Sequence, residues 1–122
     1  MKILFITPYL PSAIRTRSYN FLKGLALRGH EIHLVCLRQV DNELDETPEL
    51  QKLGIKVDII PLSKVSPYTN CLLTLASQIP LQSAFCKSPA MANKVSGILA
   101  SGNIDCVHVE HFRAAQYLDS PN

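Results

Sequence analysis

The first loop of the chain carries residue types that suit an anionic ligand. Arg15 and Arg17 lie within residues 7–17, just before and at the expected start of a helix. Guanidinium groups and the free N–H groups of a helix start both bind phosphate, so Arg15 and Arg17 are candidate substrate-binding residues. The loop has no glycine and therefore lacks the G-x-G-x-x-G pattern of dinucleotide-binding proteins. The alternative for both arginines is a solvated surface position.

A second polar group follows the last apolar run, where His108, Glu110 and His111 stand close together. In a strand, His108 and Glu110 point to one face, whereas His111 lies just past the strand end and can reach a ligand. Glu110 and His111 are therefore candidate ligand-facing residues, with surface or capping roles as the alternative. We expect His108 to be a core histidine. A metal pair of His108 and His111 lacks evident third and fourth ligands, so we expect no metal.

Strands that alternate with helices must position these two groups. Continuous apolar runs are typical of strands covered on both faces. They predict strands at 2–7, 31–37, 55–61 and 104–109, of which the third is an edge strand with one wetter face. Periodic apolar positions and cap residues predict helices at 17–29, 47–54, 68–79 and 88–101, with another starting at Phe112. An acidic connection spans residues 41–46.

This alternation predicts an α/β fold with a Rossmann-like parallel sheet and helices on both faces. The expected strand order is 3-2-1-4. Ligands of such sheets bind beyond the carboxyl ends of the strands, where the strand order reverses. That point lies between the first and fourth strands, so residues 8–16 and 110–113 are expected to face each other across a crevice.

Composition limits the function classes. A chain of 122 residues with 47% hydrophobic and 18% charged residues is one globular domain, and a net charge of +2 gives no case for nucleic acid. The four cysteines have no C-x-x-C spacing, which predicts reduced, inert thiols and a cytoplasmic protein. Cys36 and Cys106 are expected to be buried in strands. The apolar stretch 71–81 is too short and too polar to span a bilayer.

The residues also resemble a known family. The opening Lys2–Pro11 and the segment Arg15–Val35, with Gly29-His30-Glu31 after its helix, are similar to the start of retaining GT-B-type glycosyltransferases of the sucrose-synthase-like class, family four. Residues Asp105–His111 resemble the fourth strand of those proteins. Residues Ala115–Leu118 are similar to a bacterial branch of sugar transferases. The resemblance covers nearly the whole chain.

The resemblance implies that residues 1–122 are an incomplete, acceptor-side, N-terminal domain, with the donor-binding domain in a C-terminal half. The implied reaction moves a sugar from a nucleoside diphosphate sugar to a glycan or lipid acceptor, in cell-envelope polysaccharide synthesis, without a cofactor. The chain alone is expected to be inactive. The protein is expected in the cytoplasm, with peripheral contact at the inner face of the membrane.

The resemblance also bears on single residues. Ser12 stands in the part of the first loop where the family has glycine near the donor diphosphate, and it joins the substrate-binding candidates. The family histidine near the end of the fourth strand corresponds to Glu110 or His111, which makes His111 the candidate catalytic residue.

Three further expectations stay open at this point. An uncovered edge beside the fourth strand predicts a homo-oligomer, unless residues 63–86 or the C-terminal tail cover it. A non-catalytic flavodoxin-like binding module is one alternative function. A sugar-nucleotide epimerase of the same GT-B shape is the other.

Overall fold

Four parallel strands form one sheet in the order β3-β2-β1-β4. The computed structural model describes residues 1–39, 44–63, 66–78 and 80–118. The strands are β1 (Lys2–Thr7), β2 (Glu31–Arg38), β3 (Lys56–Pro61) and β4 (Cys106–Val109). The predicted α/β class, parallel pairing and strand order are confirmed, and the architecture is Rossmann-like.

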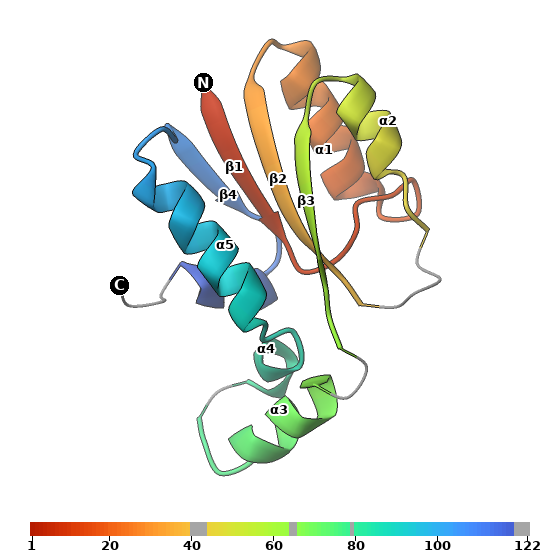
Figure 1. The fold of residues 1–122 in the computed structure, drawn as a ribbon. Coiled ribbons are helices and arrows are strands. Elements are labelled where there is room, and N and C mark those ends of the chain that lie inside the picture. The colour runs from red at the N-terminus through yellow and green to blue at the C-terminus, as the bar shows by residue number, and fades with distance from the viewer. Residues whose placement is uncertain (40–43, 64–65, 79, 119–122) are drawn as a thin grey trace.

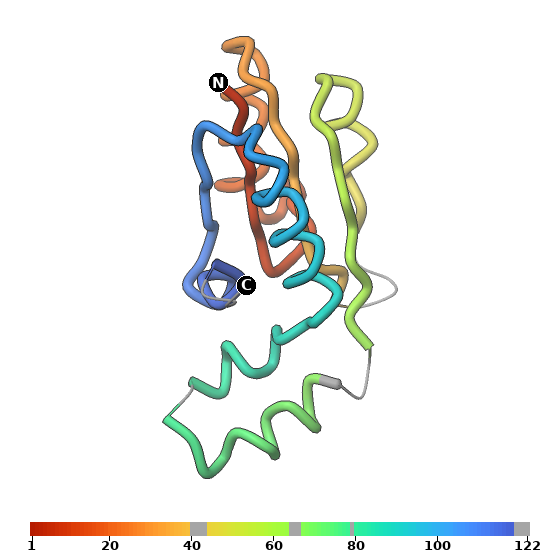
Figure 2. The backbone as a smooth tube through the Cα atoms, turned by 60° about the vertical axis from the view of Figure 1, so that its left-hand side comes forward, coloured from red at the N-terminus to blue at the C-terminus, as the bar shows by residue number. Residues whose placement is uncertain are grey.

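Helices cover both faces of the sheet (Figure 1). One face carries α1 (Thr16–Leu27) and α2 (Thr47–Lys52), and the other carries α5 (Pro89–Ala100). Between β3 and α5 lie α3 (Ser66–Thr74) and α4 (Leu81–Phe85), and a 3-10 helix, η1 (Phe112–Tyr117), follows β4. The tube in Figure 2 shows α3 and α4 set apart from the layered body, beyond the end of the sheet.

The sheet divides the core into two clusters because successive strand residues point to opposite faces. On the α1 side the buried cluster contains Phe5, Leu10, Leu22, Ile32, Leu34, Cys36, Leu50 and Ile55. On the α5 side it contains Leu4, Ile6, Val35, Leu37, Cys86, Met91, Val95, Ala114 and Tyr117. The central strand β1 is therefore buried on both faces, as its unbroken apolar run predicts.

Local signals account for the boundaries of α5. The Ser88 hydroxyl accepts a hydrogen bond from the Met91 N–H at 3.3 Å, and Pro89 occupies the first turn, where its missing N–H costs nothing. Past the helix, Gly102 has a φ of 65°, a conformation that favours glycine. The predicted helix 88–101 is confirmed to within a residue at each end.

Segment 68–79 departs from the prediction. Helix α3 ends at Thr74, a turn follows, and α4 is a separate short helix that the pattern did not predict. The Thr74 hydroxyl donates to the Asn70 carbonyl at 2.9 Å, and the Ser77 hydroxyl donates to the Thr74 carbonyl at 2.8 Å. Such side-chain bonds compete with helix propagation. Residue 79 and residues 41–43 of the predicted acidic connection lie outside the described residues.

Two smaller predictions also need correction. The segment after Phe112 forms a 3-10 helix rather than the start of an α-helix. Cys106 is exposed, not buried, because β4 is an edge strand. All four cysteines are free, and Cys36 and Cys86 are buried. No helix in the described part of the chain is long and apolar enough to cross a bilayer.

Candidate functional site

The first loop and the end of β4 meet at the carboxyl ends of the strands. Glu110 follows β4 directly, and its backbone N–H donates to the Ile6 carbonyl of β1 at 2.9 Å. Arg17, in the first turn of α1, places its Nε 3.4 Å from the Glu110 Oε1. This ion pair joins the first turn of α1 to the end of β4, next to the predicted crevice between residues 8–16 and 110–113.

Glu110 is the buried centre of a short polar chain. Only 7% of its side chain is exposed, against 87% for Arg17. Its second carboxylate oxygen lies 3.2 Å from the His108 Nε2. Because a carboxylate only accepts hydrogen bonds, the His108 Nε2 is the donor of that bond, whereas Arg17 forms an ion pair with the carboxylate. The sequence predicted Glu110 as a ligand-facing residue, and in the structure its buried carboxylate pairs with Arg17 and His108.

His108 is half-buried rather than a core residue, with 32% of its side chain exposed. Its ring stacks on Phe5 at a centroid distance of 4.5 Å and meets the edge of Phe21 at 5.0 Å. The two phenyl rings hold the imidazole in place, so its Nε2 stays directed at Glu110. His108 belongs to an edge strand of the sheet, which accounts for its partial exposure.

Ser12 and Arg15 shape the first loop. The Arg15 guanidinium lies 4.5 Å from the centre of the Tyr9 ring, and its Nη1 donates to the Leu10 carbonyl at 3.4 Å. The buried Ser12 hydroxyl accepts from the Arg15 N–H, also at 3.4 Å. The structure does not bring Ser12 or Arg15 into contact with Glu110. Their observed role is to hold the loop that leads into α1.

The start of α1 adds to the positive charge near Arg17. No side chain caps this helix start, and its first turn contains no acidic residue. The N–H groups of the first turn therefore keep the positive end of the helix dipole at the crevice. Arg17 lies in that same turn, so a bound anion would meet the guanidinium and the helix end together.

His111 has an unusual backbone conformation, with φ 78° and ψ 137°. It is the one non-glycine residue with positive φ in the described ranges. Its Nδ1 accepts a hydrogen bond from the Arg113 N–H at 3.4 Å, so it caps η1. Its exposed ring lies 4.6 Å from Phe112. A capping role, one of the two alternatives raised by the sequence, is therefore observed, and backbone strain of this kind is common at functional sites.

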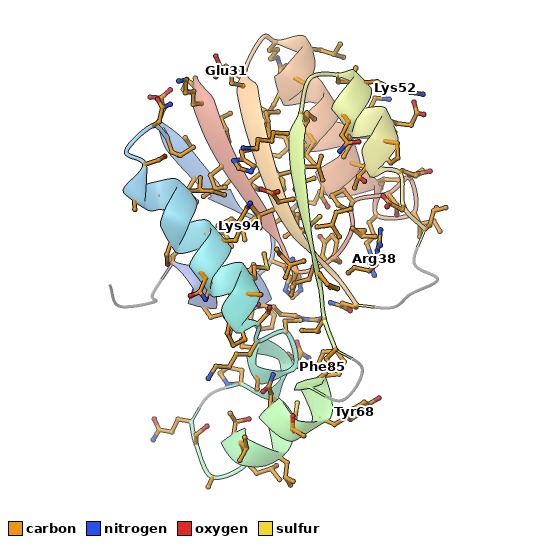
Figure 3. The ribbon with its side chains drawn as sticks, in the orientation of Figure 1. Glu31, Arg38, Lys52, Tyr68, Phe85 and Lys94 are labelled. Carbon is orange, nitrogen blue, oxygen red and sulfur yellow. The ribbon has the colours of Figure 1, made fainter. Side chains whose placement is uncertain are left out.

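A second polar cluster, which the sequence did not indicate, lies on the α5 face of the sheet. Asp58 of β3 accepts from the His33 Nε2 at 2.6 Å and from the Lys94 Nζ at 3.1 Å. Burial by itself would raise the pKa of Asp58, but the hydrogen bonds and charges of His33 and Lys94 outweigh it and lower the pKa. In Figure 3, Lys94 lies on the side of α5 that faces the sheet.

This second cluster borders a groove of about 720 Å³ between α5 and the amino ends of β1 to β3. Its polar lining includes Lys2, Glu31, Lys56, Asn93 and Asn103. The groove opens at the opposite end of the strands from Arg17 and Glu110. The only sequence signal for it was the alternation of polar residues along β3, which marked an edge strand with one wetter face.

Metal ligands do not gather at either cluster. Throughout the described part of the chain, no three His, Cys, Asp or Glu side chains lie close enough together to hold a metal ion. His108 faces the Glu110 carboxylate, while the His111 Nδ1 is engaged with the backbone of Arg113. These histidines therefore have separate hydrogen-bonding roles.

No protein-family model, no curated protein and no solved structure matches the chain.

Proposed function

We propose that this chain is the N-terminal, acceptor-side domain of a retaining glycosyltransferase. The enzyme transfers a sugar from a nucleoside diphosphate sugar to a glycan or lipid acceptor at the cytoplasmic face of the membrane. The proposal rests on the resemblance of the sequence and on one structural observation. The exposed guanidinium of Arg17 is held by the buried carboxylate of Glu110 where the strand order reverses.

The chemistry assigned to this site is electrostatic. In the departure of a nucleoside diphosphate, negative charge develops on the phosphate oxygens. Glu110 engages the Nε of Arg17, which leaves the two terminal nitrogens of the guanidinium to donate to such a group. His108 donates to the other oxygen of Glu110 and so offsets part of the carboxylate charge that would repel the anion.

His111 is the candidate catalytic residue of this proposal. It follows Glu110 directly, and its side chain is exposed beside the crevice. The strained backbone directs the chain away from β4 at this point. In this proposal its imidazole contacts the transferred sugar, and the hydrogen bond from the Arg113 N–H to Nδ1, which orients the ring, supports that role.

A transfer assay tests the proposal directly. The complete polypeptide that includes these 122 residues is incubated with a panel of nucleoside diphosphate sugars and with lipid and glycan acceptors. We expect turnover with at least one donor, and a large loss of turnover in Arg17→Ala. Arg28→Ala is the matched control, because Arg28 is exposed at the opposite end of α1. Equal turnover in the two variants would exclude Arg17 from the site.

A non-catalytic binding module is the second candidate, and the groove beside Lys94 favours it. A binding module would use that groove rather than the crevice at Arg17. Calorimetry on the 122-residue chain with nucleoside diphosphates and their sugars separates the two functions. Micromolar binding that Lys94→Ala abolishes and Arg17→Ala leaves intact would favour the module. The transferase proposal expects no such tight binding by this chain alone.

A further inference from the structure

The polar groove between α5 and the amino ends of β1, β2 and β3 is large enough to hold a small molecule. Its volume of about 720 Å³ is within the usual range for such sites. The groove exists because α5 must return the chain to β4, at the edge of the sheet. In Figures 1 and 2, α5 therefore runs obliquely, and its C-terminal end lies toward β4 and away from β3.

The strands change character along this groove. Successive residues point to opposite faces of a sheet, so the α5 face receives the even-numbered residues of β1 and β3 and the odd-numbered residues of β2. At the amino ends these positions are all polar: Lys2, Glu31, His33, Lys56 and Asp58. Further along the strands they are apolar, as at Leu4, Val35 and Ile60. The α1 face stays apolar even at the amino ends, with Ile32 and Ile55 buried there.

Three lysine ammonium groups border the groove, one each from β1, β3 and α5. The Lys2 Nζ donates to the Asn103 side-chain carbonyl at 2.9 Å, and the Lys94 Nζ lies 3.1 Å from the Asp58 carboxylate. An ammonium has three N–H groups, so both lysines retain donors for a ligand. Lys56 is exposed and pairs with no residue in the described part of the chain. The groove therefore offers several free donors to an anion.

The acidic groups near these lysines do not cancel their charge. Glu31 is the one acidic residue of the lining, against three lysines. Asp58 adds a second negative charge beside the lining, but it is already paired with His33 and Lys94, and only 24% of its side chain is exposed. The groove therefore keeps a net positive charge even when Asp58 is counted, and this charge favours an anionic ligand.

The rest of the lining suits a ligand that also carries hydroxyl groups. Asn93, Ser101 and Asn103 supply amide and hydroxyl groups, and the half-buried Ile98 adds apolar surface. Gly97 lines the groove from α5 without a side chain, and a Cβ placed there would meet no atom within 4 Å. The groove therefore has open space along the middle of α5.

We propose that this groove binds a small phosphate monoester with a hydroxyl-bearing body. The three ammonium groups bind the phosphate, which carries about two negative charges at neutral pH, and the amide and hydroxyl groups bind the body. A nucleotide fits less well, because the described lining contains no Phe, Tyr or Trp side chain on which a base could stack. The groove lies at the end of the sheet opposite Arg17 and Glu110, so the proposal is independent of the transferase activity.

Calorimetry on the chain with glucose 6-phosphate tests the choice of ligand, with glucose and inorganic phosphate as partial ligands. We expect glucose 6-phosphate to bind more tightly than inorganic phosphate, and glucose not to bind measurably. No binding of glucose 6-phosphate would overturn the proposal, and equal binding of inorganic phosphate would refute the role of the hydroxyl-bearing body. Uridine diphosphate that binds more tightly and competes with glucose 6-phosphate would refute the choice of a monoester.

Two pairs of variants test whether the ligand binds in the groove. Gly97→Phe fills the groove and should abolish binding, whereas Gly24→Phe should not, because Gly24 has similar open space but lies on α1. Lys56→Ala should weaken binding about tenfold, and Lys87→Ala, which removes an exposed lysine outside the groove, should have no effect. A thermal melt checks folding, and Lys56→Ala keeps the proposal testable if Gly97→Phe unfolds. Unchanged binding in a folded Gly97→Phe, or equal losses within each pair, would overturn the assignment of the site.

Discussion

Glu110 and Asp58 have partners of the same two kinds but differ in how deeply they and their partners are buried. Each carboxylate pairs with a histidine and with a basic side chain. Glu110 is the more deeply buried, with 7% of its side chain exposed against 24% for Asp58. The paired cations differ in the opposite sense: the Arg17 side chain is 87% exposed, and the Lys94 side chain is 41% exposed.

The difference indicates different roles. The Asp58 cluster joins β2, β3 and α5, so its bonds fasten a helix to the sheet. The Glu110 cluster joins β4 to the first turn of α1 and leaves the guanidinium in solvent at the crevice. A carboxylate that is buried under an exposed cation orients that cation, whereas one that lies between packed elements stabilises the packing. The following experiments test this distinction.

The largest expected effect is on catalysis. In the complete enzyme, Arg17→Ala should lower turnover about 10²–10³-fold, the usual cost of one oriented donor to developing charge. Its stability should change by no more than roughly 0.5 kcal/mol, because the side chain is exposed. Lys94→Ala should show the reverse: its stability should fall, while its turnover should stay within about twofold of the wild type. Kinetics and a thermal melt on both variants check this, and parallel losses of activity would erase the distinction between the clusters.

The next effect is a pH-dependent loss of stability in Asp58→Asn. The pKa of Asp58 in the folded chain lies below its ordinary value of 3.8, so the ionised group stabilises the fold above that value. The contribution is lost as the pH falls through the lowered pKa. We expect a loss of about 1–2 kcal/mol at pH 7 that shrinks below about pH 4. Urea titrations across pH, with the exposed Glu31→Gln as control, measure it, and a loss independent of pH would contradict it.

A smaller effect is expected from Glu110→Gln. The neutral amide has nearly the same shape as the carboxylate but lacks the charge that forms the ion pair with Arg17. We expect turnover to fall roughly five- to tenfold and the effect to be absent in an Arg17→Ala background, since Glu110 acts through Arg17. Additive losses in the double variant would instead indicate that Glu110 contacts the substrate itself.

The smallest effect concerns the backbone at His111. A non-glycine residue at φ 78° is strained, so His111→Gly should be more stable than His111→Ala by about 1 kcal/mol. Both variants remove the imidazole and its hydrogen bond to the Arg113 N–H. Comparison of their melting temperatures therefore isolates the backbone term. Equal melting temperatures would show that the conformation at His111 carries no strain.

Much of the architecture was determined by the sequence alone. The apolar runs of β1 and β2 predicted strands, and the alternation of strands with helices predicted parallel pairing and the strand order. Ser88 and Pro89 marked the start of α5. These features depend on local geometry and on the periodicity of apolar residues, which a single sequence displays. The meeting of the first loop with the end of β4 followed from the same topology.

The chemistry within that frame was decided by the tertiary structure. The sequence placed Glu110 beside a ligand, but packing buried it and left Arg17 exposed above it. Cys106 became exposed because β4 lies at the sheet edge, and the Asp58 cluster arose from residues on three separate elements. The exposure and the partners of a polar side chain depend on which neighbours cover it. Those neighbours are distant in the chain, so only the folded arrangement specifies them.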